Sequence, residues 1–426
     1  DFTAAFVHAD IDLPPDYDMM SPEEKDKVGV FVEMPRGFGQ PGMVLKLKKS
    51  LYGLRQAPRN HFQNCRDSLE AIGFTQAINV DPCLFISDSV ICLVYVDDCL
   101  FFARDQADID LAVERLKGHF KLEVEDEVGG FLGVHIERND KNQVILTQKG
   151  LIKRILEQLN VADLPAVDTP ANEILGKDED GDPPECTFNY ASVIGSLWYV
   201  YGHSRPDLGF ALSQCSRFTF APKRSHELAL IRIGQYLKGT ADKGMIMKPS
   251  SPDKIQMDVY VDSDFMGLYG KEKRHDSTNV KSRAGHIILI NGCPIIWSSK
   301  LQDCIALSTM MAEYYALSSA MREVLPLREL VQTIAKGCGI ADAVTTSFLT
   351  TIYEDNNGAL TLANLDPGHQ TPRSKHYDCR AHWFRSHLNS QIKVVKVDTA
   401  LQLADLFTKP LPREQFQKLR KLLIGW

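Results

Sequence analysis

Several features that would place this 426-residue chain in a common class are missing from its sequence. No run approaches the roughly eighteen apolar residues of a membrane-spanning helix, which argues against a transmembrane class. The opening residues, DFTAAFVHADI, have neither a basic start nor a long apolar segment, and they include no initiator Met. We therefore expect a partial or excised chain without a secretory signal. The ten cysteines form no CxxC pair, which favours reduced, mostly structural thiols and an intracellular setting.

A strong basic excess is also missing, because the formal net charge is −7. Nucleic-acid-binding proteins usually carry a basic surface. The charge is unevenly distributed along the chain. Residues 371–426 hold eleven Lys and Arg against four Asp and Glu, and Lys46–Arg59 is a second basic segment. Each cluster fits either phosphate binding or an ordinary solvated surface, and both interpretations stay open.

Hydrophobic patterning divides the chain into three regions. Residues 1–148 mix short β-branched and aromatic runs with turn signals, which predicts a small mixed sheet with strands such as Val28–Met34 and a helix over Asp108–Phe120. Residues 149–250 begin with an amphipathic helix, Lys149–Leu159. A Pro- and acid-rich surface linker at 164–185 and a largely helical stretch, Tyr190–Lys238, follow it.

The third region, residues 251–426, has a different order of expected elements. It reads as strand, hairpin, helix, strand, helix, strand, helix, with Asn291-Gly292 at the turn of the hairpin. This α/β order predicts a mixed sheet.

Two adjacent aspartates, Asp97 and Asp98, interrupt the apolar stretch ICLVYVDDCLFFAR. Burying an ionised carboxylate is costly unless something compensates its charge. The pattern predicts a hairpin whose tip presents both carboxylates. There they can hold two divalent cations that activate a 3′-hydroxyl and stabilise a leaving pyrophosphate. A hairpin tip with two Asp is also a common solvated turn, so the pair alone does not decide between these interpretations.

The segments around Asp97 resemble, in content and order, the reverse transcriptase of copia-type LTR retrotransposons. These segments are DFTAAFVHADI, VFVEMPRGF, LKLKKSLYGLRQAPRNHF, DPCLF, YVDD, FLGVHI, ASVIGSLWYVYGHSRPDLGFALSQCSRF and YLKGT. The resemblance covers essentially the whole chain and implies the reverse transcriptase plus RNase H region of a Pol polyprotein. The implied fold is an α+β palm-type polymerase domain (1–148), a helical thumb/connection segment (149–250) and an RNase H-like α/β domain with a mixed sheet (251–426).

The resemblance implies a polymerase site in the first region. Asp1, Asp97 and Asp98 would be its metal ligands. The resemblance also implies substrate contacts: Phe6 would be the aromatic that blocks a ribose 2′-hydroxyl, and Gln56 would lie in the nucleotide pocket. Phe131–Val134 would support the primer end. Tyr95 is a further implied substrate-binding residue, and the template phosphates would be contacted by Lys48, Lys49, Arg55 and Arg59. Core packing of Phe6, a helix-surface position for Gln56 and simple solvation of the basic residues are the alternatives.

A second set of acids in the last region resembles the RNase H site of the same family. The set is Asp262, Glu313, Asp355 and Asp405, in VYVDSDF, ALSTMMAEYYAL, YEDNNGAL and ADLFTKPL. Each acid is expected at the end of a strand or the start of a helix, where a sheet edge can gather all four around two metal ions for phosphodiester hydrolysis. His376 and Arg380, in PRSKHYDCRAHWFR, would position substrate, with a packed histidine as the alternative for His376 or His382.

The implied function is RNA-directed DNA synthesis coupled to hydrolysis of RNA in RNA/DNA hybrids. The implied cofactor is Mg²⁺, two ions per active site and replaceable by Mn²⁺, and the implied partners are RNA template, DNA primer, hybrid and dNTPs. The implied localisation is in cytoplasmic virus-like particles and in the nucleus. Because the resemblance begins at the first catalytic aspartate, the chain is expected to be N-terminally truncated with its fingers mostly missing. A remnant with only RNase H activity and a non-catalytic nucleic-acid-binding protein remain open alternatives.

Overall fold

The structure, a computed structural model, describes residues 2–35, 37–38, 42–125, 128–185, 187–250, 254–272, 275–338, 348–369, 374 and 379–426, with only the backbone of 379 and 380. The chain forms two compact units. Unit 1 comprises residues 1–126 and 326–342, and unit 2 comprises residues 127–325 and 343–426. The boundaries predicted from the sequence, at 148/149 and 250/251, stay predictions. None of the described helices is long and apolar enough to cross a membrane.

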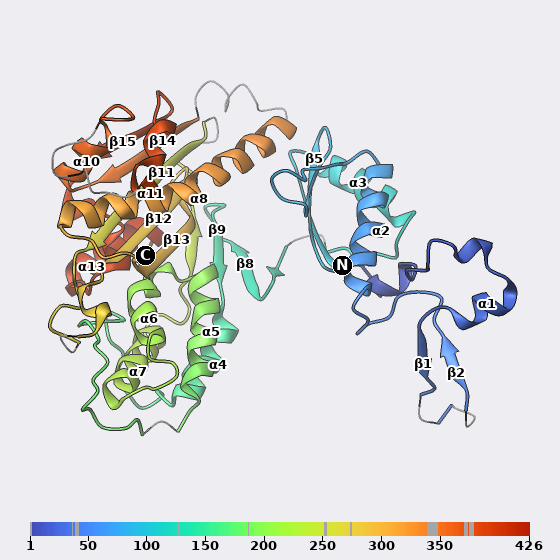
Figure 1. Cartoon of the computed structure of the whole chain (residues 1–426), viewed down its shortest axis with the longest axis horizontal. Coiled ribbons are helices and arrows are strands. Elements are labelled where there is room, and N and C mark those ends of the chain that lie inside the picture. Colours follow the sequence, from blue (N-terminus) through green and yellow to red (C-terminus); the bar gives the residue numbers. More distant parts are fainter. Residues whose placement is uncertain are drawn as a thin grey trace. The chain divides into compact units, whose positions relative to one another are not determined.

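Unit 1 is built around a four-stranded antiparallel sheet with the order β3-β4-β5-β6. Its strands are β3 (Thr75–Gln76), β4 (Leu84–Ile86), β5 (Val90–Tyr95) and β6 (Asp98–Ala103). Side chains alternate along a strand, so Val90, Cys92 and Val94 of β5 all enter the core. Helices α2 (Ala57–Ala71) and α3 (Gln106–Lys117) cover that face with the side chains of Cys65, Leu69, Ala112 and Leu116. Strand β5 of this sheet and the helices α2 and α3 are labelled in Figure 1.

The beginning of unit 1 contains short elements. They are η1 (Ala5–His8), η2 (Tyr17–Met19), α1 (Pro22–Lys27) and an antiparallel pair formed by β1 (Phe31–Glu33) and β2 (Val44–Lys46). The strand predicted over Val28–Met34 therefore forms only over Phe31–Glu33. A capping box begins α1: the Ser21 hydroxyl accepts from the backbone N–H of Glu24, and the Glu24 carboxylate accepts from the N–H of Ser21.

Unit 2 contains two sheets. The first is antiparallel with the order β10-β9-β8-β7, from β7 (Gly130–Phe131), β8 (Val134–Arg138), β9 (Val144–Thr147) and β10 (Met245–Met247). The second has the order β13-β12-β11-β14-β15, from β11 (Gln256–Asp264), β12 (Arg283–Ile290), β13 (Cys293–Leu301), β14 (Leu349–Glu354) and β15 (Ile392–Lys396). In it β11 pairs antiparallel with β12 and parallel with β14, which confirms the predicted mixed sheet. Asn291 and Gly292 join β12 to β13 with φ of +50° and +80°, as a two-residue hairpin turn requires.

The helices of unit 2 follow the predicted order. They are α4 (Lys149–Leu159), α5 (Tyr190–His203), η3 (Pro206–Leu208), α6 (Gly209–Ser216), α7 (Arg224–Lys238), η4 (Ser277–Val280), α8 (Thr309–Gly337), α10 (Asn357–Ala363), α11 (Cys379–His382), η5 (Trp383–His387), η6 (Thr399–Leu401), α12 (Asp405–Thr408) and α13 (Arg413–Ile424). Helix α8 passes from unit 2 into unit 1 at Pro326. Helix α4 has the predicted bounds, and the stretch 190–238 is interrupted at SRPDLG as expected.

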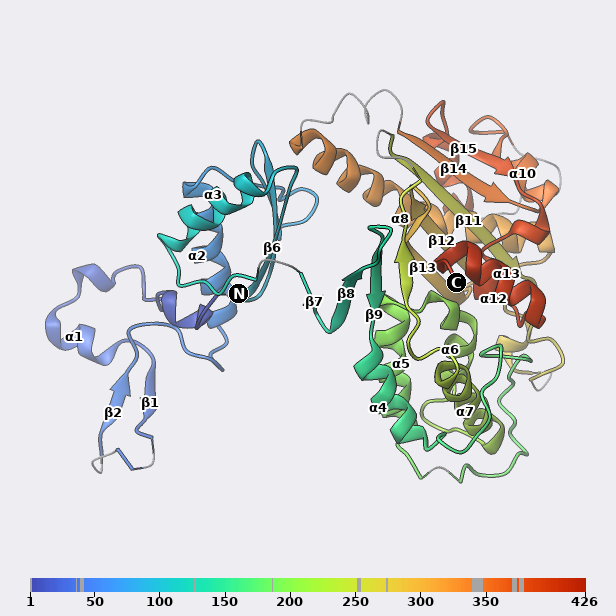
Figure 2. The same ribbon diagram turned by 180° about the vertical axis from the view of Figure 1, so that it is seen from behind.

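One apolar core joins the two halves of unit 2. It includes Ile155 of α4, Leu197 of α5 and Leu230 of α7, together with Ile287 of β12 and Phe407 of α12. Figures 1 and 2 show α4–α7 on one side of the five-stranded sheet and α12 and α13 beside β12 and β13. The helices of residues 149–250 therefore share their core with the sheet of residues 251–426.

Glycine at position 285 lets α12 lie against the sheet. A Cβ at Gly285 would lie 2.7 Å from Cβ of Phe407 and 2.7 Å from Cγ2 of Thr408. Since Gly285 is the cross-strand partner of Asp262, this close approach brings the end of α12 beside that aspartate.

A buried ion pair ties the SRPDLG turn to α7. Arg205 and Asp207 are both fully buried, and the guanidinium donates two hydrogen bonds to the carboxylate at 2.9 and 2.8 Å. Burial alone raises the pKa of Asp207, but Arg205 offsets this and holds the pKa below its usual range. The Tyr236 hydroxyl also donates to Asp207 at 2.5 Å, and Arg420 of α13 donates to that hydroxyl at 3.1 Å. The network thus links three separate elements of unit 2.

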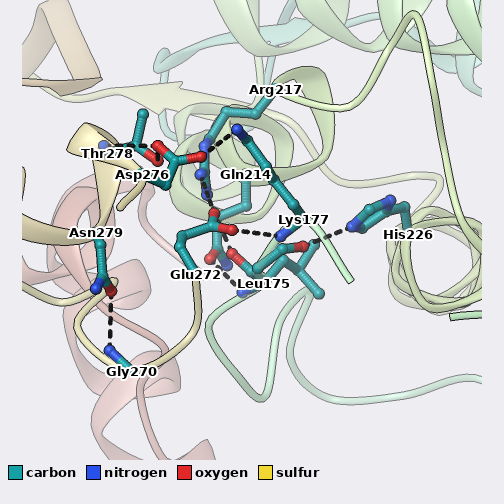
Figure 3. A network of polar contacts seen from close by, with 11 residues as sticks. Leu175, Lys177, Gln214, Arg217, His226, Gly270, Glu272, Asp276, Thr278 and Asn279 are labelled. Atoms are coloured by element: carbon teal, nitrogen blue, oxygen red, sulfur yellow. Dashed lines mark hydrogen bonds and ion pairs between the residues drawn. The ribbon is translucent and has the colours of Figure 1, made fainter. Parts of the chain in front are cut away.

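Residues 164–185 contain no helix or strand, yet part of this segment is bonded to other residues of unit 2 (Figure 3). The backbone N–H of Leu175 donates to the side-chain oxygen of Gln214, and the N–H of Lys177 donates to Glu272. Glu272 in turn pairs with Arg217 at 2.7 Å. The composition of this segment predicts only a surface linker, but tertiary hydrogen bonds hold part of it in place.

The same segment is held by the buried side chain of His226. Its Nδ1 accepts from the backbone N–H of Lys223 at 2.9 Å, and its Nε2 lies 2.7 Å from the carbonyl oxygen of Gly176. A carbonyl only accepts, so Nε2 carries the proton and the ring is neutral. The ring also stacks on Phe218 with centroids 3.7 Å apart. Burial lowers the pKa of His226.

We expect unit 2 to lose stability as the pH falls below about 6.5, the ordinary pKa of histidine. The lowered pKa in the folded state means that the unfolded chain binds a proton more readily, so the contribution of His226 is complete above pH 6.5 and is lost as the pH falls through the folded pKa. Thermal unfolding at pH 7.5 and 5.5 measures this loss. In a His226→Gln variant the difference between the two melting temperatures should shrink, and an unchanged difference would contradict the assignment.

Candidate active sites

The Asp97-Asp98 pair lies at the tip of the β5–β6 hairpin, as predicted. Tyr95 and Asp98 form the last cross-strand pair, so Val96 and Asp97 make a two-residue turn. Val96 has a φ of +57°, a left-handed conformation that is unusual and strained for a β-branched residue. Both aspartates are half-buried. Strained turns of this kind cluster at functional sites, which favours the functional interpretation of the pair.

Both carbonyl groups of this turn are held by neighbouring residues. The backbone N–H of Phe2 donates to the Asp97 carbonyl at 2.8 Å, and Nε2 of His61 lies 3.0 Å from the carbonyl of Val96. His61 lies on α2 and is buried, and burial lowers its pKa. Its ring stands edge-on to Phe2 at 5.3 Å. Helix α2 and the first described residue of the chain thus fix the backbone that carries Asp97.

The other residues predicted for the polymerase site have mixed surroundings. Phe6 is half-buried, and its ring packs edge-on against Tyr52 at 4.6 Å. Gln56 precedes α2, and its side-chain nitrogen is buried without a hydrogen-bond partner among the described residues. Lys49 pairs with Asp10 at 2.7 Å and Arg59 with Asp12 at 2.6 Å, while Lys48, Arg55 and Tyr95 are exposed. The roles assigned to all these residues stay predictions.

Three predicted residues cannot be placed. Asp1 and His376 lie outside the described residues, and the side chain of Arg380 does too. The alternative proposed for His382, a packed histidine, fits its surroundings, since its Nδ1 lies 3.0 Å from the Tyr314 hydroxyl.

The second set of acids gathers at one edge of the five-stranded sheet. Asp262 lies near the end of β11, Asp355 directly follows β14, and these two strands run parallel, so their carboxyl ends share an edge. Glu313 comes from the first turns of α8. Asp262, Glu313 and Asp355 each offer a carboxylate oxygen within 4.8 Å of the others. The predicted grouping of these three is therefore present in the structure.

The fourth acid joins the cluster through a lysine. Asp405 begins α12 and is buried. Nζ of Lys409 lies 2.8 Å from Oδ1 of Asp405 and 3.5 Å from Oδ2 of Asp262. The Thr408 hydroxyl donates to Asp262 as well. One end of α12 thus contacts Asp262 through two adjacent side chains.

Crowding of buried carboxylates raises their pKa values. Burial is the largest cause for Glu313, followed by repulsion from Asp262, and it places the pKa of Glu313 well above the usual range. Burial and repulsion from Asp262 also raise the pKa of Asp405 to about 7. Glu354, the residue before Asp355, is fully buried, and burial raises its pKa to about 8. The site concentrates negative charge that a bound cation would relieve.

Two buried glutamines fasten the elements that carry the acids. Gln302 donates through Nε2 to the carbonyl of Ala312 at 2.7 Å and to the Ser263 hydroxyl at 3.3 Å, next to Glu313 and Asp262 respectively. Gln402 donates to the carbonyl of Val261 at 2.9 Å, and its Oε1 accepts from the N–H of Ala404 at 3.3 Å. Each glutamine therefore bonds residues that flank two of the acids.

Sequence reasoning missed Glu354, Lys409 and the two glutamines. Lys409 carries a usable signal, since it lies four residues after Asp405, a spacing that brings side chains together on a helix. The glutamines carry none, because the residues that they join are far apart in the sequence.

The carboxylate cluster fits a hard divalent cation. Carboxylate oxygens are the ligands that Mg²⁺ and Ca²⁺ prefer. Oε2 of Glu313 is buried and has no hydrogen-bond partner among the described residues, so it is free to accept a ligand. Among the described residues, no cysteine or histidine belongs to the cluster, and this donor set favours magnesium-type chemistry over soft metals.

Residues 1–173 match the sequence profile of a family described as reverse transcriptase (RNA-dependent DNA polymerase), which identifies this part of the chain as a member of that class. The chain as a whole is related to retrotransposon Pol polyproteins. It is 31% identical over 99% of its length to the retrovirus-related Pol polyprotein from transposon TNT 1-94 of Nicotiana tabacum. It is also 31% identical over 91% of its length to that from transposon RE1 of Arabidopsis thaliana. The resemblance to copia-type Pol polyproteins is thereby confirmed.

The chain spans only 30% and 26% of these two relatives. Among solved structures, a foamy viral protease-reverse transcriptase in complex with double-stranded DNA aligns with 88% of this chain and 55% of its own, at 12% identity and a TM-score of 0.19. That score is too low to relate the two folds, so the assignment to the family rests on sequence.

Proposed function

We propose that this chain carries out RNA-directed DNA synthesis in unit 1 and hydrolyses the RNA strand of RNA/DNA hybrids in unit 2. The observation that carries the proposal is the meeting of Asp262, Glu313 and Asp355 within 4.8 Å at one edge of a mixed sheet. Three elements that are distant in sequence contribute these acids. Asp262 and Glu313 are buried and Asp355 is half-buried, and such a grouping of like charges is costly unless a cation compensates it.

The proposed architecture assigns a role to each region. Residues 1–148 would form the palm, residues 149–250 the thumb and connection, and residues 251–426 the RNase H-like domain. The sheet order β13-β12-β11-β14-β15, with three antiparallel strands followed by two parallel ones, supports the last assignment.

In the hydrolytic site, Asp262, Glu313, Asp355 and Asp405 would hold two divalent cations, Mg²⁺ foremost. When bound, such cations supply Lewis-acid chemistry to the cleavage of a phosphodiester. The chain itself sets the positions of the ligands. The Thr408 hydroxyl orients Asp262, and Gln302 and Gln402 fix the separation of the elements that carry the acids.

In the polymerase site, Asp97 and Asp98 would be ligands on the β5–β6 hairpin, with Asp1 as the third. Support comes from the strained Val96 and from the bonds of Phe2 and His61 to the turn, which hold the backbone that carries the carboxylates. A ligand set needs this kind of support, because a loosely held carboxylate costs metal affinity.

A groove in unit 2 offers a surface for the nucleic acid. It has a volume of about 880 Å³, and its lining includes His135, Lys149, Arg154 and Tyr199. Gly133, in the predicted primer-supporting segment, also lines it, and the Tyr199 hydroxyl donates to the carbonyl of Leu132. Cationic side chains beside an aromatic ring fit a sugar-phosphate backbone, which would make binding sequence-tolerant and sensitive to salt.

A single reaction tests both activities. The full chain is mixed with a labelled RNA template annealed to a DNA primer, Mg²⁺ and dNTPs, and primer extension and RNA cleavage are read from the same tube. We expect both products, and both should disappear when EDTA removes the metal. Cleavage without extension would restrict the function to the RNase H-like site. The absence of both at low salt would overturn the proposal in favour of a non-catalytic nucleic-acid-binding protein.

A further inference from the structure

The lysine at the carboxylate cluster is placed where a cation ligand would bind. Nζ of Lys409 contacts Oδ1 of Asp405 at 2.8 Å and Oδ2 of Asp262 at 3.5 Å. Both carboxylates are almost fully buried, with side-chain exposures of 6% and 3%, whereas the lysine side chain is 35% exposed. The ammonium group thus enters a buried anionic site from a stem that reaches the surface.

The charge of Lys409 acts on three of the four acids. It lowers the pKa values of Asp262, Glu313 and Asp405, opposing the effect of burial on each. Burial lowers the pKa of Lys409 itself, but the nearby carboxylates, Asp262 first, offset this and raise it, so the lysine is charged at neutral pH. Without a metal ion, this positive charge offsets part of the repulsion among the acids.

Lys409 and a metal ion need the same oxygen atoms. A divalent cation would bind the oxygen atoms of Asp262 and Asp405 that now form ion pairs with the ammonium group, and two cations in contact with the same carboxylates repel each other. The lysine can give way, since a four-carbon stem with several rotatable bonds carries its charge and part of that stem already meets solvent.

We propose that Lys409 is a built-in counter-ion of the carboxylate centre, which keeps the metal-free site folded and is displaced when a divalent cation binds. This inference rests on the metal site of the proposed function and adds a competition to it. Removal of the Lys409 side chain should therefore raise the affinity for the metal ion and lower the stability of the metal-free protein. The reason is that the stabilisation that Lys409 gives to the metal-free state is lost when the metal ion binds.

Binding of Mn²⁺ tests the competition without any measurement of activity. The loss of the electron paramagnetic resonance signal of free Mn²⁺ gives the dissociation constant, and tryptophan fluorescence in EDTA gives the metal-free melting temperature. All proteins carry Asp97→Asn, so that the polymerase hairpin does not contribute to the binding. We expect Lys409→Met to bind Mn²⁺ about tenfold more tightly, which corresponds to about 1.4 kcal/mol, and to melt at a lower temperature in EDTA.

Lys396→Met is the matched control. Lys396 also lies beside the cluster, but its ammonium group donates to the backbone carbonyl of Asp355 rather than to a carboxylate. Its removal changes the local charge equally and removes no competitor, so its Mn²⁺ affinity should stay within about twofold of the parent. If Lys409→Met does not fold, Lys409→Gln keeps a polar side chain there and carries the same expectation.

The outcomes separate the two proposals. Equal or weaker Mn²⁺ binding by the Lys409 variants, with normal binding by the parent, would overturn the displacement and leave the metal site intact. An equal gain in affinity for Lys396→Met would show that any nearby positive charge weakens metal binding, and it would also overturn the displacement of Lys409. The absence of Mn²⁺ binding from the parent and from every variant would overturn the metal site itself.

Discussion

Replacing Glu313 by Gln is expected to lower RNA-strand cleavage by about 10²–10³-fold or more, the loss that follows removal of one principal electrostatic group from an active site, while primer extension continues. Glutamine keeps the shape of the side chain but removes the negative charge that a metal ligand needs. The same change relieves repulsion from Asp262 and Asp355, so the melting temperature of the metal-free protein should stay equal or rise. Cleavage and extension assays on the full chain, with a thermal melt in EDTA, measure all three quantities.

Two further variants complete this experiment. Glu323→Gln changes the same residue type further along α8, where the carboxylate bonds His286 at 3.0 Å, and it should retain cleavage. Asp97→Asn should abolish extension and leave cleavage intact. If Glu313→Gln cleaved RNA as well as Glu323→Gln, the assignment of the hydrolytic site would be wrong.

Replacing Asp207 by Ala is expected to lower the free energy of unfolding of unit 2 by about 3–5 kcal/mol, since it leaves the fully buried guanidinium of Arg205 without its partner. The Tyr236 hydroxyl loses its acceptor at the same time. Urea unfolding followed by tryptophan fluorescence is the measurement. It reports on unit 2 alone, because the four tryptophans of the chain (Trp198, Trp297, Trp383 and Trp426) all belong to that unit.

The controls separate charge burial from charge loss. Glu157→Ala removes an exposed partner of Lys153, 4.0 Å away, and should cost less than about 0.5 kcal/mol. The double variant Arg205→Met, Asp207→Leu removes both buried charges and should be closer to the parent than Asp207→Ala alone. A cost below about 1 kcal/mol for Asp207→Ala would contradict the role given to this pair.

Much of the fold is predictable from local pattern. The amphipathic helix at Lys149–Leu159, the hairpin turn at Asn291-Gly292 and the interruption at SRPDLG each depend on residues that are near one another in the sequence. The core shared by α4–α7 and the five-stranded sheet is different, because it depends on which apolar faces meet in three dimensions. For the same reason, composition describes residues 164–185 as a linker and does not reveal the bonds of Leu175 and Lys177 to Gln214 and Glu272.

The candidate sites also have one part that the sequence predicts and another that it does not. Asp97 and Asp98 are visible as two carboxylates in an apolar hairpin, while Asp262, Glu313 and Asp355 are distinguished from the other acids only by the motifs around them. The partners of these acids are set by tertiary packing. Gln302 lies beside both Ser263 and Ala312 because a hairpin and a helix converge there, and no spacing in the sequence encodes that arrangement.

The contact between Thr408 and Asp262 has a consequence for the order of events during protein synthesis. The two residues are 146 positions apart. At about 5–20 residues per second, roughly 7–30 s pass between their incorporation. For nearly all of that interval the growing chain already carries the complete β5–β6 hairpin but lacks both Asp405 and Lys409. The two candidate sites would therefore be completed one after the other on the ribosome, with the carboxylate cluster of unit 2 following the β5–β6 hairpin of unit 1.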